Sequence, residues 1–160
     1  MRIVSGIMLA FLLLVLVAPA QDKAPATAEF YDIKYDAAAN PFRQLDAAKE
    51  EAAKSGKRIL LDIGGEWCIW CHRMDDLFRA NKDLSELLTK NYVIAKINVS
   101  MENKNEIFMA QFPKVAGYPH LYVLEADGKL VHSQDTGQLE EGKDHSKEKV
   151  TEFLKKWRKS

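Results

Sequence analysis

Residues 58–72 read RILLDIGGEWCIWCH and join a short apolar segment to a pair of cysteines. The first part, 58–63, is mostly apolar and is followed by Gly64-Gly65. Such a run is typical of a central strand that is covered on both faces. From Cys68 onward the apolar residues recur at helical spacing. The stretch therefore predicts a buried strand, a short loop and a helix that carries Cys68 and Cys71 at its start.

Cys68 and Cys71 are the only 2 cysteines among the 160 residues. A disulfide that closes so short a loop removes little entropy from the unfolded chain, which favours a reactive role over a structural one. Unpaired N–H groups and the positive dipole end at the start of a helix stabilise a thiolate. Cys68 is nearer to that start, so we expect it to be the nucleophile and Cys71 to resolve the mixed disulfide.

The remaining sequence predicts helices that alternate with strands, which is an α/β layered arrangement. Asn40 and Pro41 indicate a helix start, and Asp127-Gly128 indicates a hairpin turn. A last helix has an apolar stripe and either Asp144 or Ser146 as its cap. The other expected elements are helices at 41–55, 83–90 and 104–112, strands at 92–99, 121–124 and 130–133, and the stripe at Val150, Phe153, Leu154 and Trp157.

The first residues are typical of an export signal, with Arg2, the apolar run 7–17 and cleavage expected after Ala20. An uncleaved membrane anchor is the alternative, although the run is shorter than the roughly 20 residues that span a bilayer comfortably. Residues 21–29 are small and polar and predict a flexible segment. We therefore expect a signal peptide at 1–20, one domain at 30–160 and a periplasmic location, where disulfides persist.

Charge and motif spacing narrow the classes of ligand. The 23 basic residues equal the 23 acidic ones, which argues against nucleic acid as a partner. Cys68-Ile69-Trp70-Cys71-His72 literally satisfies the haem-attachment pattern, for which His72 and then Met101 or Met109 would bind the iron. Zinc is less suited, because the two cysteines and His72 are too close together and no second Cys/His pair is present.

The strand and cysteine segment resembles the active-site region of the thioredoxin family. That family has an acid six positions before the first cysteine and a tryptophan directly before it, matched by Asp62 and Trp67. It also has a lysine in the next central strand and a cis-proline before a later strand, which Lys96 and Pro119 match. The family glycine that follows the hairpin is matched by Gly137. The resemblance covers 42–157 and implies a thioredoxin-like fold, a central mixed sheet flanked by helices.

The Trp-Cys-x-Trp-Cys-His form is similar to exported thiol:disulfide interchange and isomerase proteins. It implies an oxidoreductase that reduces, isomerises or exchanges protein disulfides and needs no metal or bound cofactor. Ile69 and Trp70 carry no charge, which favours a reductase or isomerase over a strong oxidant. A non-catalytic binding module with the same fold is an alternative, separated from an enzyme by replacement of Cys68.

Several residues receive expected roles around the cysteines. Burial of Asp62 in an apolar strand should raise its pKa and equip it to take a proton from Cys71. Lys96 would moderate that pKa, and His72 and Glu66 would tune the site. The other residues, by expected role, are Trp67, Ile69, Trp70, Tyr118 and Pro119 for substrate contact, His120 as a flanking residue, and His132 and His145 as surface residues.

The expected partners follow from export and from the thiol chemistry. Substrates would be exported proteins that contain disulfides or thiols. A cis bond at Tyr118-Pro119 would turn the backbone outward to pair with an extended substrate segment. A reductase or isomerase outside the cytosol needs electrons, for which a membrane thiol relay is the expected donor.

Overall fold

The computed structural model describes residues 30–160; the expected signal peptide at 1–20 and flexible segment at 21–29 lie outside the described residues. The elements follow the order that the sequence predicts, with small additions. In chain order they are η1 (Phe30–Asp32), α1 (Pro41–Ser55), β1 (Arg58–Gly64), α2 (Ile69–Ala80), α3 (Lys82–Asn91), β2 (Tyr92–Asn98), α4 (Glu106–Met109), β3 (His120–Leu124), β4 (Leu130–Asp135), η2 (Thr136–Leu139), β5 (Glu140–Glu141), β6 (Asp144–His145) and α5 (Lys147–Trp157).

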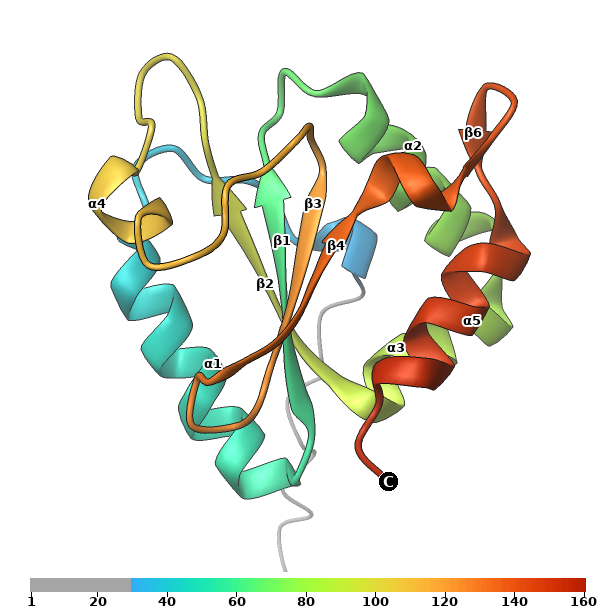
Figure 1. Cartoon of the computed structure of the whole chain (residues 1–160), viewed down its shortest axis with the longest axis horizontal. Helices are drawn as coiled ribbons and strands as arrows, with labels where there is room; N and C mark the ends of the chain where they lie inside the picture. Colours follow the sequence, from blue (N-terminus) through green and yellow to red (C-terminus); the bar gives the residue numbers. More distant parts are fainter. Residues whose placement is uncertain (1–29) are drawn as a thin grey trace, which may run out of the picture.

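A four-stranded sheet in the order β2-β1-β3-β4 forms the centre of the molecule. β1 is parallel to β2 and antiparallel to β3, and β3 is antiparallel to β4, so the sheet is mixed. Helices α1 and α4 lie on one side of it and α2, α3 and α5 on the other (Figure 1). The expected α/β arrangement, a central mixed sheet flanked by helices, is confirmed.

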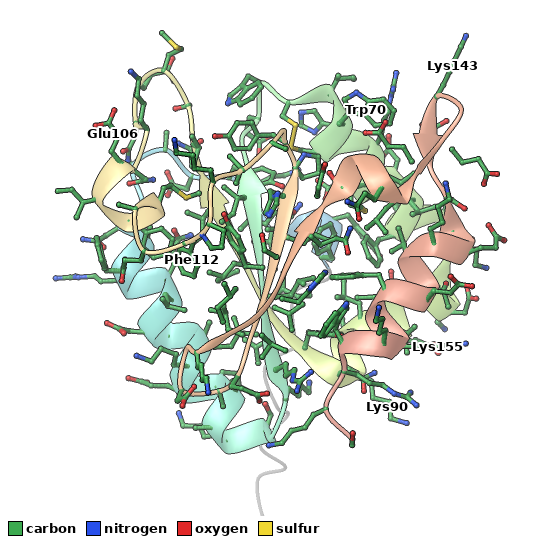
Figure 2. All side chains as sticks on the ribbon, in the orientation of Figure 1. Trp70, Lys90, Glu106, Phe112, Lys143 and Lys155 are labelled. Atoms are coloured by element: carbon green, nitrogen blue, oxygen red, sulfur yellow. A yellow bond between two sulfur atoms is a disulfide. The ribbon has the colours of Figure 1, made fainter. Side chains whose placement is uncertain are left out.

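The central strand β1 is buried on both faces, and its side chains alternate between two cores. Ile59, Leu61 and Ile63 belong to the core on the α1 side, whereas Leu60 belongs to the core beneath α2, α3 and α5. Because side chains along a strand alternate, Asp62 points to the same face as Leu60. Side chains fill the space on both sides of the sheet (Figure 2). The strand therefore carries its single acid into the core that includes α2.

Local sequence explains where α1 begins and ends. The Asn40 side chain accepts hydrogen bonds from the N–H groups of Phe42 and Arg43, and Pro41 occupies the first turn. Gly56 follows the helix with a φ of 73°, a left-handed conformation that glycine adopts without strain. The expected helix at 41–55 is confirmed with both of its ends.

The helix expected at 104–112 is wrong in length, because α4 comprises only Glu106–Met109. Asn105 precedes it with a φ of 49°, and its side-chain amide donates to the carbonyl of Asn98 at 2.7 Å. Its own N–H donates to the side chain of Asn103. Such local side-chain bonds compete with the helical ones, so the first turn of the expected helix is replaced by a loop.

The last helix starts directly after one of the two residues that the sequence predicts as its cap. Ser146 is the residue before α5, although its hydroxyl donates to Glu148 rather than capping the helix, and Asp144 lies in β6. Val150, Phe153 and Leu154 are buried, as the apolar stripe predicts. Within residues 30–160, no helix is both long and apolar enough to cross a membrane.

Candidate functional site

The two cysteines form a disulfide at the start of α2. Cys68 is the N-cap residue of this helix, and its Sγ accepts a hydrogen bond from the N–H of Cys71 at 3.1 Å. Cys68 is 3% exposed and Cys71 is fully buried. An N–H group and the positive dipole end of α2 thus face the sulfur of Cys68, where they stabilise a thiolate once the disulfide is reduced.

Gly64, at the end of β1, lets the strand come close to the disulfide. A Cβ at this position would stand 2.6 Å from Sγ of Cys71 and 3.0 Å from the hydroxyl oxygen of Tyr35. Real Cβ atoms do not approach a sulfur so closely, so no larger residue fits without a shift. The hydroxyl of Tyr35 and the sulfur of Cys71 therefore converge on the same glycine.

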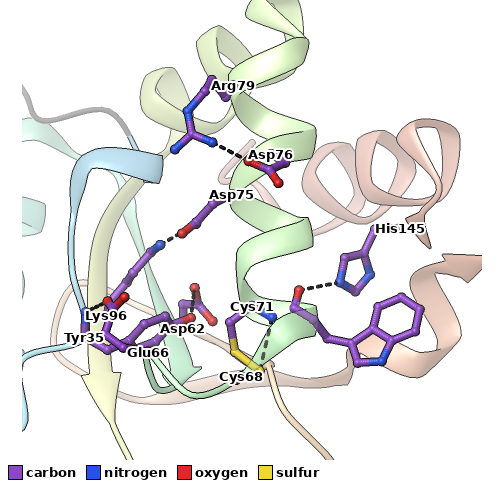
Figure 3. A network of polar contacts seen from close by, with 11 residues as sticks. Tyr35, Asp62, Glu66, Cys68, Cys71, Asp75, Asp76, Arg79, Lys96 and His145 are labelled. Atoms are coloured by element: carbon purple, nitrogen blue, oxygen red, sulfur yellow. Dashed lines mark hydrogen bonds and ion pairs between the residues drawn. A yellow bond between two sulfur atoms is a disulfide. The ribbon is translucent and has the colours of Figure 1, made fainter. Parts of the chain in front are cut away.

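Asp62 is 1% exposed and lies beside the disulfide, on the side of Cys71 (Figure 3). The hydroxyl of Tyr35 donates a hydrogen bond of 2.6 Å to Oδ2 of Asp62, while Oδ1 has no hydrogen-bond partner among residues 30–160. Burial raises the pKa of Asp62 to about 6, against the lowering effects of the charge on Lys96 and of the Tyr35 hydrogen bond. The raised pKa agrees with the expectation from the apolar strand.

Lys96 is fully buried on β2, in register with Asp62 on β1, and its direct partner is Asp75. Asp75, which sequence reasoning did not single out, is 6% exposed and points toward Lys96 (Figure 3). Burial raises the pKa of Asp75 and the bond to Lys96 lowers it. The site thus holds two buried carboxyl groups and one ammonium group.

Residues 30–36, called here the 30–36 segment, complete the site from outside the motif. The Lys96 ammonium lies 4.3 Å from the ring centroid of Phe30 and 5.0 Å from that of Tyr35. The N–H of Tyr35 donates to Oε1 of Glu66 at 2.9 Å, which fixes the segment to the loop before the cysteines. Sequence reasoning missed Tyr35, and its only signal there was an aromatic residue that precedes the first predicted helix.

The expected substrate-contact residues surround the disulfide at the surface. Trp67 and Ile69 are 58% and 60% exposed. The Trp67 indole donates to the carbonyl of Val99 at 2.8 Å and meets the ring of Tyr118 edge-on. The Tyr118-Pro119 peptide bond is cis. An exposed aromatic and aliphatic surface therefore lies next to Cys68.

Two histidines, His132 and His145, are less exposed than the sequence predicts. His145 was expected at the surface, which is wrong: it is 4% exposed, and its Nε2 donates to the carbonyl of Trp70 at 3.2 Å. The β5–β6 hairpin folds back toward the start of α2 and brings it there, and burial lowers the pKa of its imidazole. His132 is also wrong as a surface residue, because it is half-buried and stacks on Trp157 at 4.0 Å.

The remaining two histidines occupy different sides of the molecule. His72 is near the disulfide in sequence, and its Nε2 donates to the carbonyl of Glu66 at 2.8 Å. His120 is buried, contacts Tyr122 in the core on the α1 side and bonds Ser133 at 2.8 Å. Since Leu121 is the residue opposite Asp62, the His120 side chain points to the other face of the sheet and does not join the site.

Within the described residues 30–160, no group of three or more His, Cys, Asp or Glu side chains is placed to hold a metal ion. A family model described as thioredoxin-like matches residues 40–126, which is more than half of the chain. Among solved structures, a disulphide isomerase from Xylella fastidiosa has a TM-score of 0.67 at 26% identity, covering 76% of this chain and 94% of that one. This likeness confirms the thioredoxin-like fold that the sequence resemblance implies.

Two relatives carry names that refer to disulfides. The disulfide bond reductase DsbH of Chlamydia pneumoniae is 28% identical over 91 residues, which cover 51% of this chain and 54% of that protein. The thiol:disulfide interchange protein DsbD of Klebsiella pneumoniae is 26% identical over 132 residues, which cover 81% of this chain and 21% of that protein. The chain thus spans about half of the first relative and a fifth of the second.

Proposed function

This chain belongs to the thioredoxin-like family, and on that premise we propose that it is an exported thiol:disulfide oxidoreductase that reduces or isomerises protein disulfides. One observation carries the proposal. The Cys68–Cys71 disulfide lies at the N-terminus of α2, with the buried carboxyl group of Asp62 beside it. That arrangement provides both a stabilised thiolate and a group that takes up a proton.

The exchange reaction requires the reduced pair. The thiolate of Cys68 attacks one sulfur of a substrate disulfide, and the second substrate sulfur leaves as a thiolate that takes a proton from solvent. Cys71 then attacks the sulfur of Cys68, the bond from Cys68 to the substrate breaks, and the Cys68–Cys71 disulfide forms. Two protein thiols are oxidised while the substrate disulfide becomes two thiols. A dithiol donor restores the reduced pair.

Asp62 serves as the proton acceptor for Cys71. Its pKa of about 6 leaves it mostly ionised at neutral pH, and an acceptor with a pKa near the working pH is effective. Lys96 keeps this pKa from rising further. His72 and Glu66 tune the site through the loop they share, since His72 bonds the Glu66 carbonyl.

The substrate binds over the exposed residues beside Cys68. Trp67 and Ile69 offer apolar contact area, and the half-buried Trp70 has Arg73 over its ring at 4.4 Å. Tyr118 and Pro119 offer backbone to an extended segment of the substrate. The uncharged Ile69 and Trp70 add no positive charge beside the thiolate, which supports reduction or isomerisation over strong oxidation.

The expected export signal and the relatives' names support the cellular part of the proposal. Substrates are exported proteins with disulfides or free thiols in the periplasm, and a membrane thiol protein supplies the electrons. The names disulfide bond reductase and thiol:disulfide interchange protein agree with this use of the cysteine pair.

The haem alternative uses the same residues less well. A haem bonded to both cysteines takes its axial ligand from the histidine that follows them. Here the two sulfurs are bonded to each other, and Nε2 of His72 donates to the carbonyl of Glu66. Thiol exchange fits this geometry without rearrangement.

Reduction of insulin by the purified protein, with dithiothreitol as the electron donor, tests the proposal. We expect turnover from the wild type and none above background from Cys68→Ser. Cys71→Ser, the matched variant, reduced and then freed of dithiothreitol before it meets insulin, should instead accumulate a mixed disulfide with substrate that mass spectrometry detects. A folded wild type without turnover would refute the enzyme and favour a binding module.

A further inference from the structure

Tyr35 contacts both partners of the expected proton transfer. Its hydroxyl donates to Oδ2 of Asp62 at 2.6 Å. The same hydroxyl oxygen and Sγ of Cys71 lie 3.0 Å and 2.6 Å from the position of a Cβ on Gly64. Tyr35 also packs in one cluster with Cys68 and Cys71. A tyrosine from the 30–36 segment thus lies against both the buried acid and the buried thiol.

The two oxygens of Asp62 are not equivalent. Oδ2 is occupied by the Tyr35 hydroxyl, whereas Oδ1 is buried without a hydrogen-bond partner among residues 30–160. A hydrogen bond to the charged form of a carboxyl group favours that form. The bond to Tyr35 therefore keeps Asp62 ionised and fixes its plane, which leaves Oδ1 available to receive a proton.

The other charged groups that face Asp62 are few. Lys96 reaches it from β2 and favours its ionised form, and Asp75 reaches it from α2 and disfavours that form. Glu66 approaches Tyr35 through the loop before the cysteines. From β3 the residue opposite Asp62 is the apolar Leu121. Tyr35 is the neighbour that bonds Asp62 directly, because Lys96 is bonded to Asp75.

We propose that Tyr35 is a positioning residue for thiol exchange, whose hydroxyl orients Asp62 so that Oδ1 takes the proton of Cys71. The inference rests on the proposed function. In the resolving step the Cys71 proton moves to Oδ1, Cys71 attacks the sulfur of Cys68, and the substrate thiolate departs. The proton then passes from Asp62 to solvent.

Tyr35→Phe removes the hydroxyl and keeps the ring. Without the donor, the pKa of Asp62 should rise by about one unit. With the wild-type pKa at about 6, resolution should then be roughly fivefold slower at pH 6, and the two rates should converge above pH 8. Tyr31→Phe is the matched control, because it removes a hydroxyl from the same segment, where the Tyr31 ring lies beneath Arg79 instead.

Two measurements on the full domain test the inference. The 13C resonance of the Asp62 carboxyl group, assigned by its loss in Asp62→Asn, reports the pKa directly in the oxidised protein. The reduced protein is mixed with oxidised glutathione, and tryptophan fluorescence reports formation of the Cys68–Cys71 disulfide. The glutathione concentration is raised until the observed rate no longer rises, so that the resolving step is the one measured. We expect the pH midpoint of the carboxyl titration and that of the resolving rate to move upward in Tyr35→Phe, and neither to move in Tyr31→Phe.

The outcomes separate the inference from the function on which it rests. A wild type that does not react with glutathione disulfide refutes the proposed function, and a pH profile unchanged in Asp62→Asn refutes the role of Asp62. The role of Tyr35 alone is overturned if the wild type is active and Asp62→Asn is slow, but Tyr35→Phe behaves like Tyr31→Phe. If Tyr35→Phe does not fold, 3-fluorotyrosine at position 35 keeps the ring and hydroxyl; its stronger donor should lower the midpoint, and an unchanged midpoint overturns the inference.

Discussion

The two faces of the central sheet are built from alternate residues of the same strands, yet they hold different kinds of core. Toward α1, strands β1 and β2 present Ile59, Leu61, Ile63, Ala95 and Ile97, all apolar and buried. Toward α2 the same strands present apolar residues at one end and the charged side chains of Asp62 and Lys96 at the other. One face is apolar along both strands, whereas the other buries charged groups, which the proposed function uses for proton transfer.

The largest expected effect is on the charged face. Lys96→Met leaves Asp62 and Asp75 buried without their cation, which should cost about 4 kcal/mol of unfolding free energy at pH 8. The pKa values of both carboxyl groups would then rise further above their unfolded values. Because a raised acid pKa destabilises the folded state only above the unfolded pKa, the loss should shrink as the pH falls toward 4.

Urea unfolding between pH 4 and 8 measures that loss. Lys49→Met, which removes a partly exposed lysine from α1, is the control and should change stability by less than about 0.5 kcal/mol. An equal loss for Lys96→Met at both ends of the pH range would show that packing, rather than charge, sets the cost.

The next effect lies on the apolar face. Leu61→Ala removes a fully buried side chain and should cost about 3 kcal/mol of stability at every pH. Its insulin turnover per folded molecule should remain that of the wild type, since Leu61 points away from the disulfide. A clear fall in turnover for the folded variant would mean that the two faces are coupled.

A smaller effect of opposite sign is expected for Asp62→Asn. The folded pKa of Asp62 is about 6 against 3.8 for the free side chain, so stability falls as the pH rises from 3.8 to about 6, and the full loss is present above 6. The shift corresponds to at most about 3 kcal/mol, and we expect the neutral variant to be about 2 kcal/mol more stable at pH 8 and equal to the wild type at pH 4. Thermal denaturation at both pH values measures it, and no gain at pH 8 would show that the acid is not under strain from burial.

The smallest effect concerns a helix start on the apolar side. Asn40→Ala removes the side chain that caps α1 and should cost about 1 kcal/mol. The equilibrium of the Cys68/Cys71 pair with a glutathione buffer should not change. If that equilibrium does shift, α1 contributes to the redox site as well.

Local patterns of sequence were sufficient for most of the scaffold. The apolar run at 58–63, the cysteine pair and the capped helix at 41–55 depend on neighbours within a few residues, and all appear as expected. The buried Asp62 followed from its apolar neighbours. Asp75 could have been found, because it lies one helical turn after Cys71 on the same face.

Other parts of the site depend on contacts between distant residues, which no local pattern reports. Tyr35 meets Asp62 across 27 positions, and His145 meets Trp70 across 75. The shortened α4 follows from asparagine side chains that bond the backbone of their own loop. In each case the partner becomes visible only once the chain is folded.

Residues 40–126 match the family model, and one segment of the chain on each side of them lies outside that match. Tyr35 comes from the flanking segment before them and His145 from the flanking segment after them, and both end on the residues around the cysteines. A chimera that transplants only residues 40–126 would carry the cysteines but leave Asp62 and Trp70 without these neighbours. Substitutions in the flanking segments can therefore change the surroundings of the cysteines while the signature residues themselves stay the same.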